Sequence, residues 1–104
     1  MKRAGNFLLL AMALPLFAPV ASAAGDAAKG KQVYMTICIA CHNTDPSKDG
    51  AVGPALKGSP KALIEARVMK AAYPPGYKPK RPTVMMPPYP HLKASIDDLA
   101  AFLK

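Results

Sequence analysis

Three stretches of the chain repeat apolar side chains at helical spacing, and no stretch shows the period-two alternation of a strand. The first covers residues 26 to about 39, the second begins at Ser59-Pro60 and ends near Tyr73, and the third begins at Ser95. This pattern predicts an all-α fold with three main helices. The predicted inward-facing residues are Gly30, Val33, Tyr34, Ile37, Leu63, Ile64, Val68, Ala71, Ile96, Leu99, Phe102 and Leu103.

Residues at the ends of these stretches agree with the predicted limits. Asp26 can cap the first helix, and Ser59 can cap the second with Pro60 at the first helical position, where a missing N–H costs nothing. The prolines that begin at Pro74 end the second helix, because proline cannot continue it. Two aspartates follow Ser95, where carboxylates suit the positive end of a helix. We therefore expect three separate helices joined by loops.

The segment from Pro74 to Pro90 contains seven prolines, together with two tyrosines and two methionines. Proline fixes φ and removes a backbone donor, so neither a helix nor a central strand forms there. A disordered linker has such a composition too, but only one short helix follows and large side chains are unusual in a solvated tether. We expect an ordered loop that presents a residue to a cofactor, because proline lowers the entropy lost on ordering.

The first 23 residues have the three parts of a secretory signal peptide. Lys2-Arg3 precede an apolar run from Phe7 to Val20, and Ala21-Ser22-Ala23 supplies the small-x-small cleavage pattern. The run of about 14 residues is shorter than the ~20 of a spanning helix. We expect cleavage after Ala23, export to a bacterial periplasm and no stable membrane insertion afterwards. An uncleaved anchor is the alternative.

The mature domain would then be residues 24–104, and its size and charge restrict its function. A core of this size usually needs a disulfide, a metal or a cofactor for stability, and the chain is too short for a multidomain enzyme. Twelve basic side chains face six acidic ones, a surplus that favours anionic partners through long-range steering. Without a basic stripe interleaved with aromatic residues, we expect no nucleic-acid partner.

The only two cysteines occur in Cys38-Ile39-Ala40-Cys41-His42, the C-x-x-C-H pattern of c-type haem attachment. Two thiols at this spacing can reach the two vinyl groups of a porphyrin, and the histidine that follows can bind the iron. A thioredoxin-like dithiol would need flanking strands, and zinc would need two well-spaced ligand pairs. A disulfide would close a loop too small to add much stability. Covalent haem is the favoured interpretation among these.

With this motif the chain resembles the class I c-type cytochromes of the small monohaem bacterial type, over nearly the whole mature sequence. Gly30 and Tyr34 are similar to that family's first-helix glycine and aromatic residue. Leu99 and Phe102 are similar to the last-helix pair that packs across them. The resemblance implies three main helices and a proline-rich loop around one covalent haem c, bound through two thioether bonds.

The resemblance also implies which residues hold the iron. His42 would be the proximal ligand, and Gly53-Pro54-Ala55-Leu56 resembles the segment whose proline carbonyl orients that histidine. Pro54 would therefore accept a hydrogen bond from His42. Met86 stands before two prolines, as in the family's Met-Pro element, and would be the distal ligand.

Other residues leave parts of this site open. Met85 is the alternative to Met86, and His91 would give a bis-histidine iron. Met35 and Met69 fall within helices and are expected to fill the core, since thioethers fill gaps well. The chain lacks the tryptophan that some members direct at a haem propionate. The candidates to cover or hold the propionates are Tyr73, Tyr77, Tyr89 and Arg81.

Imidazole and thioether ligation raises the reduction potential and leaves no open position on the iron. The resemblance therefore implies a monomeric periplasmic electron carrier, not an enzyme, whose redox partners carry acidic docking faces. Lys78, Lys80 and Arg81 are expected to mark the docking face. The alternatives are a haem subunit bound permanently to a larger redox enzyme, which should expose an apolar patch, and a peroxidase or gas sensor with an openable site.

Overall fold

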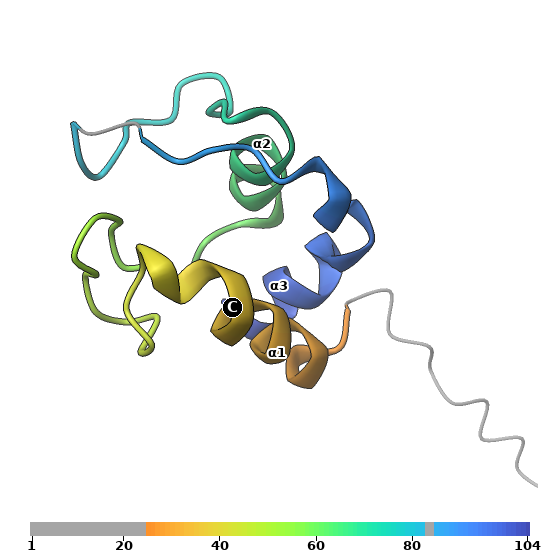
Figure 1. Ribbon diagram of the computed structural model, residues 1–104. Helices are drawn as coiled ribbons and strands as arrows, with labels where there is room; N and C mark the ends of the chain where they lie inside the picture. The colour runs from red at the N-terminus through yellow and green to blue at the C-terminus, as the bar shows by residue number, and fades with distance from the viewer. Residues whose placement is uncertain (1–24, 83–84) are drawn as a thin grey trace, which may run out of the picture.

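The computed structural model describes residues 25–82 and 85–104, and every regular element in these ranges is a helix (Figure 1). The all-α class with three main helices is therefore confirmed. The predicted signal peptide, residues 1–23, lies outside the described residues. In chain order the elements are α1 (Ala27–Ile37), the short 3-10 helix η1 (Cys38–Ala40), α2 (Lys61–Lys70), the 3-10 helix η2 (Pro90–Ser95) and α3 (Ile96–Phe102).

Helices α1 and α3 come from opposite ends of the described chain and lie against each other, as Figure 1 shows. Gly30 permits this contact, because a Cβ at that position would lie only 2.0 Å from the carbonyl oxygen of Asp98. Tyr34 and Leu99 are both fully buried beside it. The Tyr34 ring packs against Phe102 with 5.3 Å between the ring centroids. The sequence prediction for this helix pair is confirmed.

The start of α1 follows its predicted cap. The Asp26 carboxylate accepts hydrogen bonds from the backbone N–H groups of Ala28 (2.9 Å) and Lys29 (3.3 Å). The backbone N–H of Asp26 itself donates to the Asp98 carboxylate at 2.8 Å. The same aspartate thus caps α1 and connects its first turn to α3.

The limits of α2 differ from the predicted ones. The sequence predicts Ser59 as the cap, but its hydroxyl donates to the carbonyl of Leu56 and so closes the preceding turn. The extended Pro60 becomes the N-cap, without a side-chain hydrogen bond. The helix ends at Lys70 rather than near Tyr73, because Ala71 adopts a left-handed conformation with φ of 51°.

The core forms where the three helices meet. Its buried members are Tyr34, Ile64, Val68, Leu92, Ile96, Leu99 and Leu103. Leu92 was missed by the sequence analysis, because η2 lies between a proline-rich segment and the predicted start of the last helix. Met69 packs against this core as predicted, but the prediction for Met35 is wrong: it is 38% exposed. It follows the buried Tyr34, and one residue turns about 100° around a helix, here toward solvent.

The described parts of the proline-rich segment contain no helix before η2, in agreement with the prediction. Its backbone is tied to α2 where the N–H of Tyr89 donates to the carbonyl of Val68 at 2.6 Å. The side chains of Met86 and Tyr89 pack against the core. These two large side chains of the segment thus turn inward, as expected, whereas Met85 is exposed. Within the described ranges, no helix combines the length and the apolar character needed to cross a bilayer.

Candidate functional site

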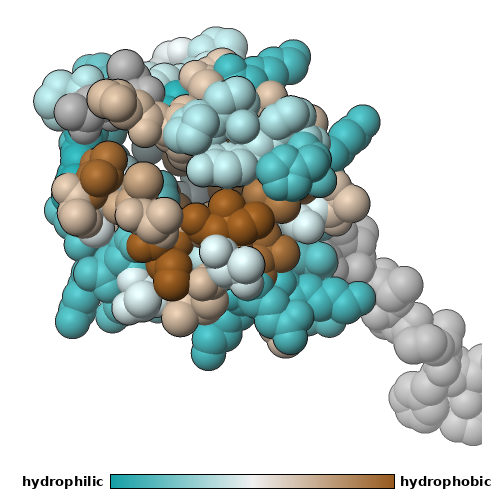
Figure 2. Space-filling model, in the orientation of Figure 1, coloured by the Kyte–Doolittle hydropathy of each residue, from teal (hydrophilic) through white to brown (hydrophobic). Residues whose placement is uncertain are grey.

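A large open cavity lies between the α1–η1 side of the molecule and the side formed by α2 and the proline-rich segment. Its empty space, together with the solvent in its open mouth, is about 1210 Å³. Figure 2 shows apolar side chains gathered along one edge of the opening. Core residues of α2, η2 and α3 line its interior, among them Leu63, Val68, Leu92 and Leu99. The cavity can therefore enclose a large, mainly apolar group.

The C-x-x-C-H turn places its three reactive side chains on one wall of this cavity. The backbone N–H groups of Cys41 and His42 both donate to the carbonyl of Cys38, at 3.3 and 2.9 Å. This tight turn brings the two half-buried thiols and the imidazole to the same space. The two sulfurs form no disulfide. Burial raises the pKa of the Cys38 thiol to about 11, so this sulfur is a neutral thiol near neutral pH.

The His42 ring is oriented by the backbone of Pro54, whose carbonyl oxygen lies 2.9 Å from Nδ1. A carbonyl only accepts, so Nδ1 carries the proton and Nε2 keeps a free lone pair. Burial lowers the pKa of His42, and the positive charge of Arg81 adds to that effect, although the bond to Pro54 acts in the opposite direction. The imidazole is therefore neutral at neutral pH, as iron ligation requires.

Gly53 contacts the His42 ring, a role that was not predicted from the sequence. A Cβ on this glycine would lie 2.3 Å from Cε1 and 2.5 Å from Nδ1 of His42. The Gly53 backbone N–H donates to the carbonyl of Cys41 at 2.9 Å. The absence of a side chain at this position lets the loop support the ring directly.

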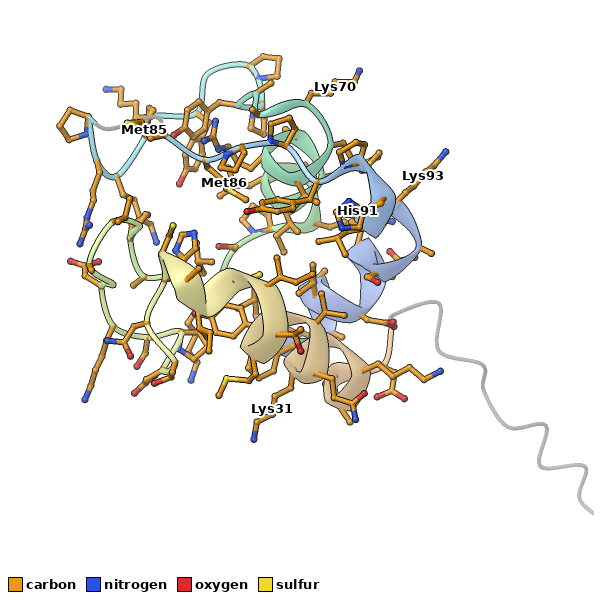
Figure 3. All side chains as sticks on the ribbon, viewed as in Figure 1. Lys31, Lys70, Met85, Met86, His91 and Lys93 are labelled. Atoms are coloured by element: carbon orange, nitrogen blue, oxygen red, sulfur yellow. The ribbon has the colours of Figure 1, made fainter. Side chains whose placement is uncertain are left out.

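The two adjacent methionines differ in burial. Both line the cavity, but Met85 is 81% exposed whereas Met86 is half-buried and packs against the core. Figure 3 shows Met86 nearer the middle of the molecule. His91 is exposed on η2, outside the cavity lining, with its ring edge against Tyr89. The structure thus brings Met86 to the same cavity as His42 and leaves His91 outside it.

A polar and aromatic wall completes the cavity. The Arg67 guanidinium lies 4.3 Å from the centre of the Tyr73 ring, and Tyr73 stacks on Tyr77 at 5.6 Å. Both tyrosines were candidates from the sequence, but Arg67 was missed. Its position four residues after the inward-facing Leu63 was a usable signal, because residues at i and i+4 share a helix face.

The three cations expected to mark a docking face are not equivalent. Lys78 and Lys80 are both exposed and Arg81 is half-buried, but Lys80 and Arg81 also line the cavity and contact the facing loop. The Lys80 ammonium donates to the Ala55 carbonyl at 3.0 Å. The Arg81 guanidinium donates to the Gly50 carbonyl at 3.1 Å. Two of the three cations therefore connect loops within the molecule.

The loop that supports His42 should loosen in acid. The amide of Ala55 donates to the Asp49 carboxylate at 2.8 Å, and this bond, with the charge of Arg81, lowers the pKa of Asp49 from its ordinary value. A carboxyl whose pKa is lowered in the folded protein stabilises the fold at pH values above its ordinary pKa. This contribution is lost as the pH falls through the lowered pKa. We expect the Ala55 amide to lose hydrogen-exchange protection as the pH falls through the lowered pKa of Asp49. Amide exchange followed by NMR measures this loss.

The amide of Gly50 is an internal control for that measurement, since it donates to the carbonyl of Gly53 at 2.9 Å and not to a carboxylate. Its protection should persist in acid after correction for intrinsic exchange rates. Protection of Ala55 that stays the same from about pH 6 down to a pH at which Asp49 is protonated would contradict the role of Asp49.

The sequence model of the cytochrome c family matches residues 27–104. The chain belongs to the cytochrome c family, whose members are typically electron carriers that contain a covalent haem c. Comparison with curated proteins found no match, and comparison with solved structures found none either. The cavity fits such a cofactor on its own chemistry, because one turn presents two thiols and a neutral imidazole to a large apolar space.

Proposed function

We propose that the protein is a one-electron carrier that holds a single haem c through Cys38 and Cys41, with His42 and Met86 as axial ligands. The observation that carries this proposal is the hydrogen bond between His42 and Pro54 in a cavity that both cysteines and Met86 line. When bound, the haem supplies an iron that changes oxidation state by one electron.

Different residues of the chain would attach the haem and bind its iron. The two cysteine sulfurs would form thioether bonds that prevent loss of the cofactor. Pro54 fixes the tautomer of His42, and Met86 would supply a soft thioether ligand that raises the reduction potential. With His42 and Met86 both held toward the iron by the protein, neither oxidation state would require a change of ligands.

The lining of the cavity favours a carrier over a peroxidase. A peroxidase needs a distal acid–base group beside an open iron position. In the part of the chain that the structure describes, no carboxylate and no second histidine lines the cavity. His91, the candidate from the sequence, is exposed outside it.

The location and partners of the carrier form part of the proposal. The predicted signal peptide supports export to the periplasm, and the surplus of basic residues supports partners with acidic docking faces. Because Lys80 and Arg81 contact the facing loop, Lys78 is the cation of this segment best placed to meet a partner.

Electron transfer with an acidic redox partner should slow as salt rises, because exposed charges are screened over ~8–10 Å at physiological ionic strength. Reversing Lys78 to glutamate should flatten that dependence, mainly through the association rate. Stopped-flow measurement of the second-order rate at several salt concentrations gives both results. A rate independent of salt in the parent protein would refute steering by this surface.

The covalent haem is tested by denaturing mass spectrometry of the exported protein together with visible spectra in both redox states. We expect a mass that exceeds the polypeptide starting at or near Ala24 by one haem. The oxidised spectrum should also contain the methionine–iron charge-transfer band. A bare polypeptide mass from cells with working haem-attachment machinery would overturn the proposal.

A further inference from the structure

Two loops meet at the mouth of the cavity, and three charged side chains hold them together. One loop, residues 49–55, contains the glycine and proline that contact His42. The other, residues 78–82, precedes Met86 in the chain. We use the name mouth clamp for Asp49, Lys80 and Arg81.

The contacts of Lys80 and Arg81 run from one loop to the other. The Arg81 guanidinium donates to the Gly50 carbonyl at 3.1 Å and lies 3.6 Å from the Asp49 carboxylate. The Lys80 ammonium donates to the Ala55 carbonyl at 3.0 Å. The Arg81 side chain is only 28% exposed, so its position is restricted by packing as well as by charge.

Asp49 connects the clamp to the support of the histidine. Its second carboxylate oxygen accepts the N–H of Ala55, the residue after Pro54. One carboxylate therefore holds the loop that orients His42 and also receives the guanidinium of the opposite loop. No other ion pair joins these two loops among the described residues.

We propose that Lys80, Arg81 and Asp49 are positioning residues that hold the Met86 segment against the His42 side of the cavity and so keep small external ligands away from the iron. This inference rests on the proposed ligation by Met86. An external ligand must displace the methionine, so its apparent affinity reports the fraction of molecules in which the Met86 segment has moved away.

The probe is imidazole, titrated into the purified oxidised holoprotein and followed by loss of the methionine–iron band. Arg81→Gln and Lys80→Gln should each tighten imidazole binding by about threefold, the scale of one charge-assisted hydrogen bond at a partly exposed site. Arg81→Lys keeps the charge and one donor, and should recover part of the parent behaviour. High salt should tighten binding to the parent protein more than to Arg81→Gln, because salt screens the pair.

Lys78→Gln is the matched control. It removes the same charge from the same loop, and Lys78 makes no hydrogen bond or ion pair within the described residues. Its imidazole affinity should equal that of the parent protein. Parent affinity in both Arg81→Gln and Lys80→Gln would overturn the inference. An equal change in all three glutamine variants would overturn it too, because net charge alone would then explain the result.

Asp49→Asn is a second variant that keeps an oxygen for the Ala55 amide but removes the charge that faces Arg81. It should tighten imidazole binding in the parent protein and have no further effect in an Arg81→Gln background. Additive effects of Asp49→Asn and Arg81→Gln in this double-mutant cycle would overturn the inference. A parent protein without the methionine band would overturn the ligation by Met86 and the clamp with it, which distinguishes that failure from the failure of the clamp alone.

Discussion

Replacing Met86 with alanine should abolish the methionine–iron band and lower the reduction potential by on the order of 0.1 V or more, within the ~0.8 V range that axial ligands set. Met86 packs against the core and lines the cavity. If it is the distal ligand, as proposed, its loss leaves that position to water or to small ligands. Visible spectroscopy and potentiometry of the variant holoprotein measure both effects. Weak peroxidase activity should accompany them.

Met85→Ala is the matched control, since it removes the same side chain one residue earlier. Met85 is 81% exposed, and its removal should leave the band and the potential nearly unchanged. Loss of the band in Met85→Ala and its retention in Met86→Ala would move the ligand by one residue. An unaltered spectrum in both variants would refute methionine ligation.

Replacing Gly53 with alanine should destabilise the protein by about 1–3 kcal/mol, the usual cost of an added methyl group in a packed site. The new Cβ would lie 2.3 Å from Cε1 of His42, so either the ring or the loop must move. Both movements strain the hydrogen bond to Pro54, which orients the imidazole of the proposed proximal ligand. Chemical denaturation measures the loss of stability, and NMR of the oxidised protein reports the changed ring orientation.

Gly58→Ala separates this effect from the general cost of replacing a glycine. Gly58 has a φ of +84° and no atom within 4 Å of a Cβ placed there. Its substitution should cost about 1–2 kcal/mol through backbone strain alone. The histidine environment should not change in this variant. Identical NMR spectra for Gly53→Ala and the parent protein would refute the contact with the His42 ring.

The sequence predicted the helices well because their signals are local. Apolar spacing and the cap at Asp26 define α1 without reference to the rest of the chain. The prediction failed where tertiary context decides. The Ser59 hydroxyl is held by the preceding turn instead of capping α2, and the left-handed Ala71 ends that helix early. Neither preference can be read from residue type.

For the cavity residues too, local signals were predicted correctly and long-range contacts were not. The cysteines and His42 form a contiguous motif, so the sequence alone places them together. The bonds of Lys80 and Arg81 were missed because they join segments far apart in the chain. Arg67, by contrast, contacts near neighbours, Ala71 and Tyr73, and its helical register was a signal that was not used. From the sequence, charged residues in a proline-rich segment are predicted to be solvated. Only the structure shows the carbonyl groups that face them. The contacts across the mouth of the cavity therefore cannot be predicted from the sequence alone.

The contact between α1 and α3 has a consequence for the order in which this domain is built. The bond from Asp26 to Asp98 spans 72 residues, and Leu99 and Leu103 form part of the cavity wall. During synthesis the cysteine motif emerges well before these residues, so the early chain presents its thiols without a finished pocket. The contacts of α3 with α1 form only when this long sequence separation is closed, which is a non-local event. Nascent chains that lack α3 should remain open to the machinery that attaches the cofactor, and full-length chains should lose that access as they fold.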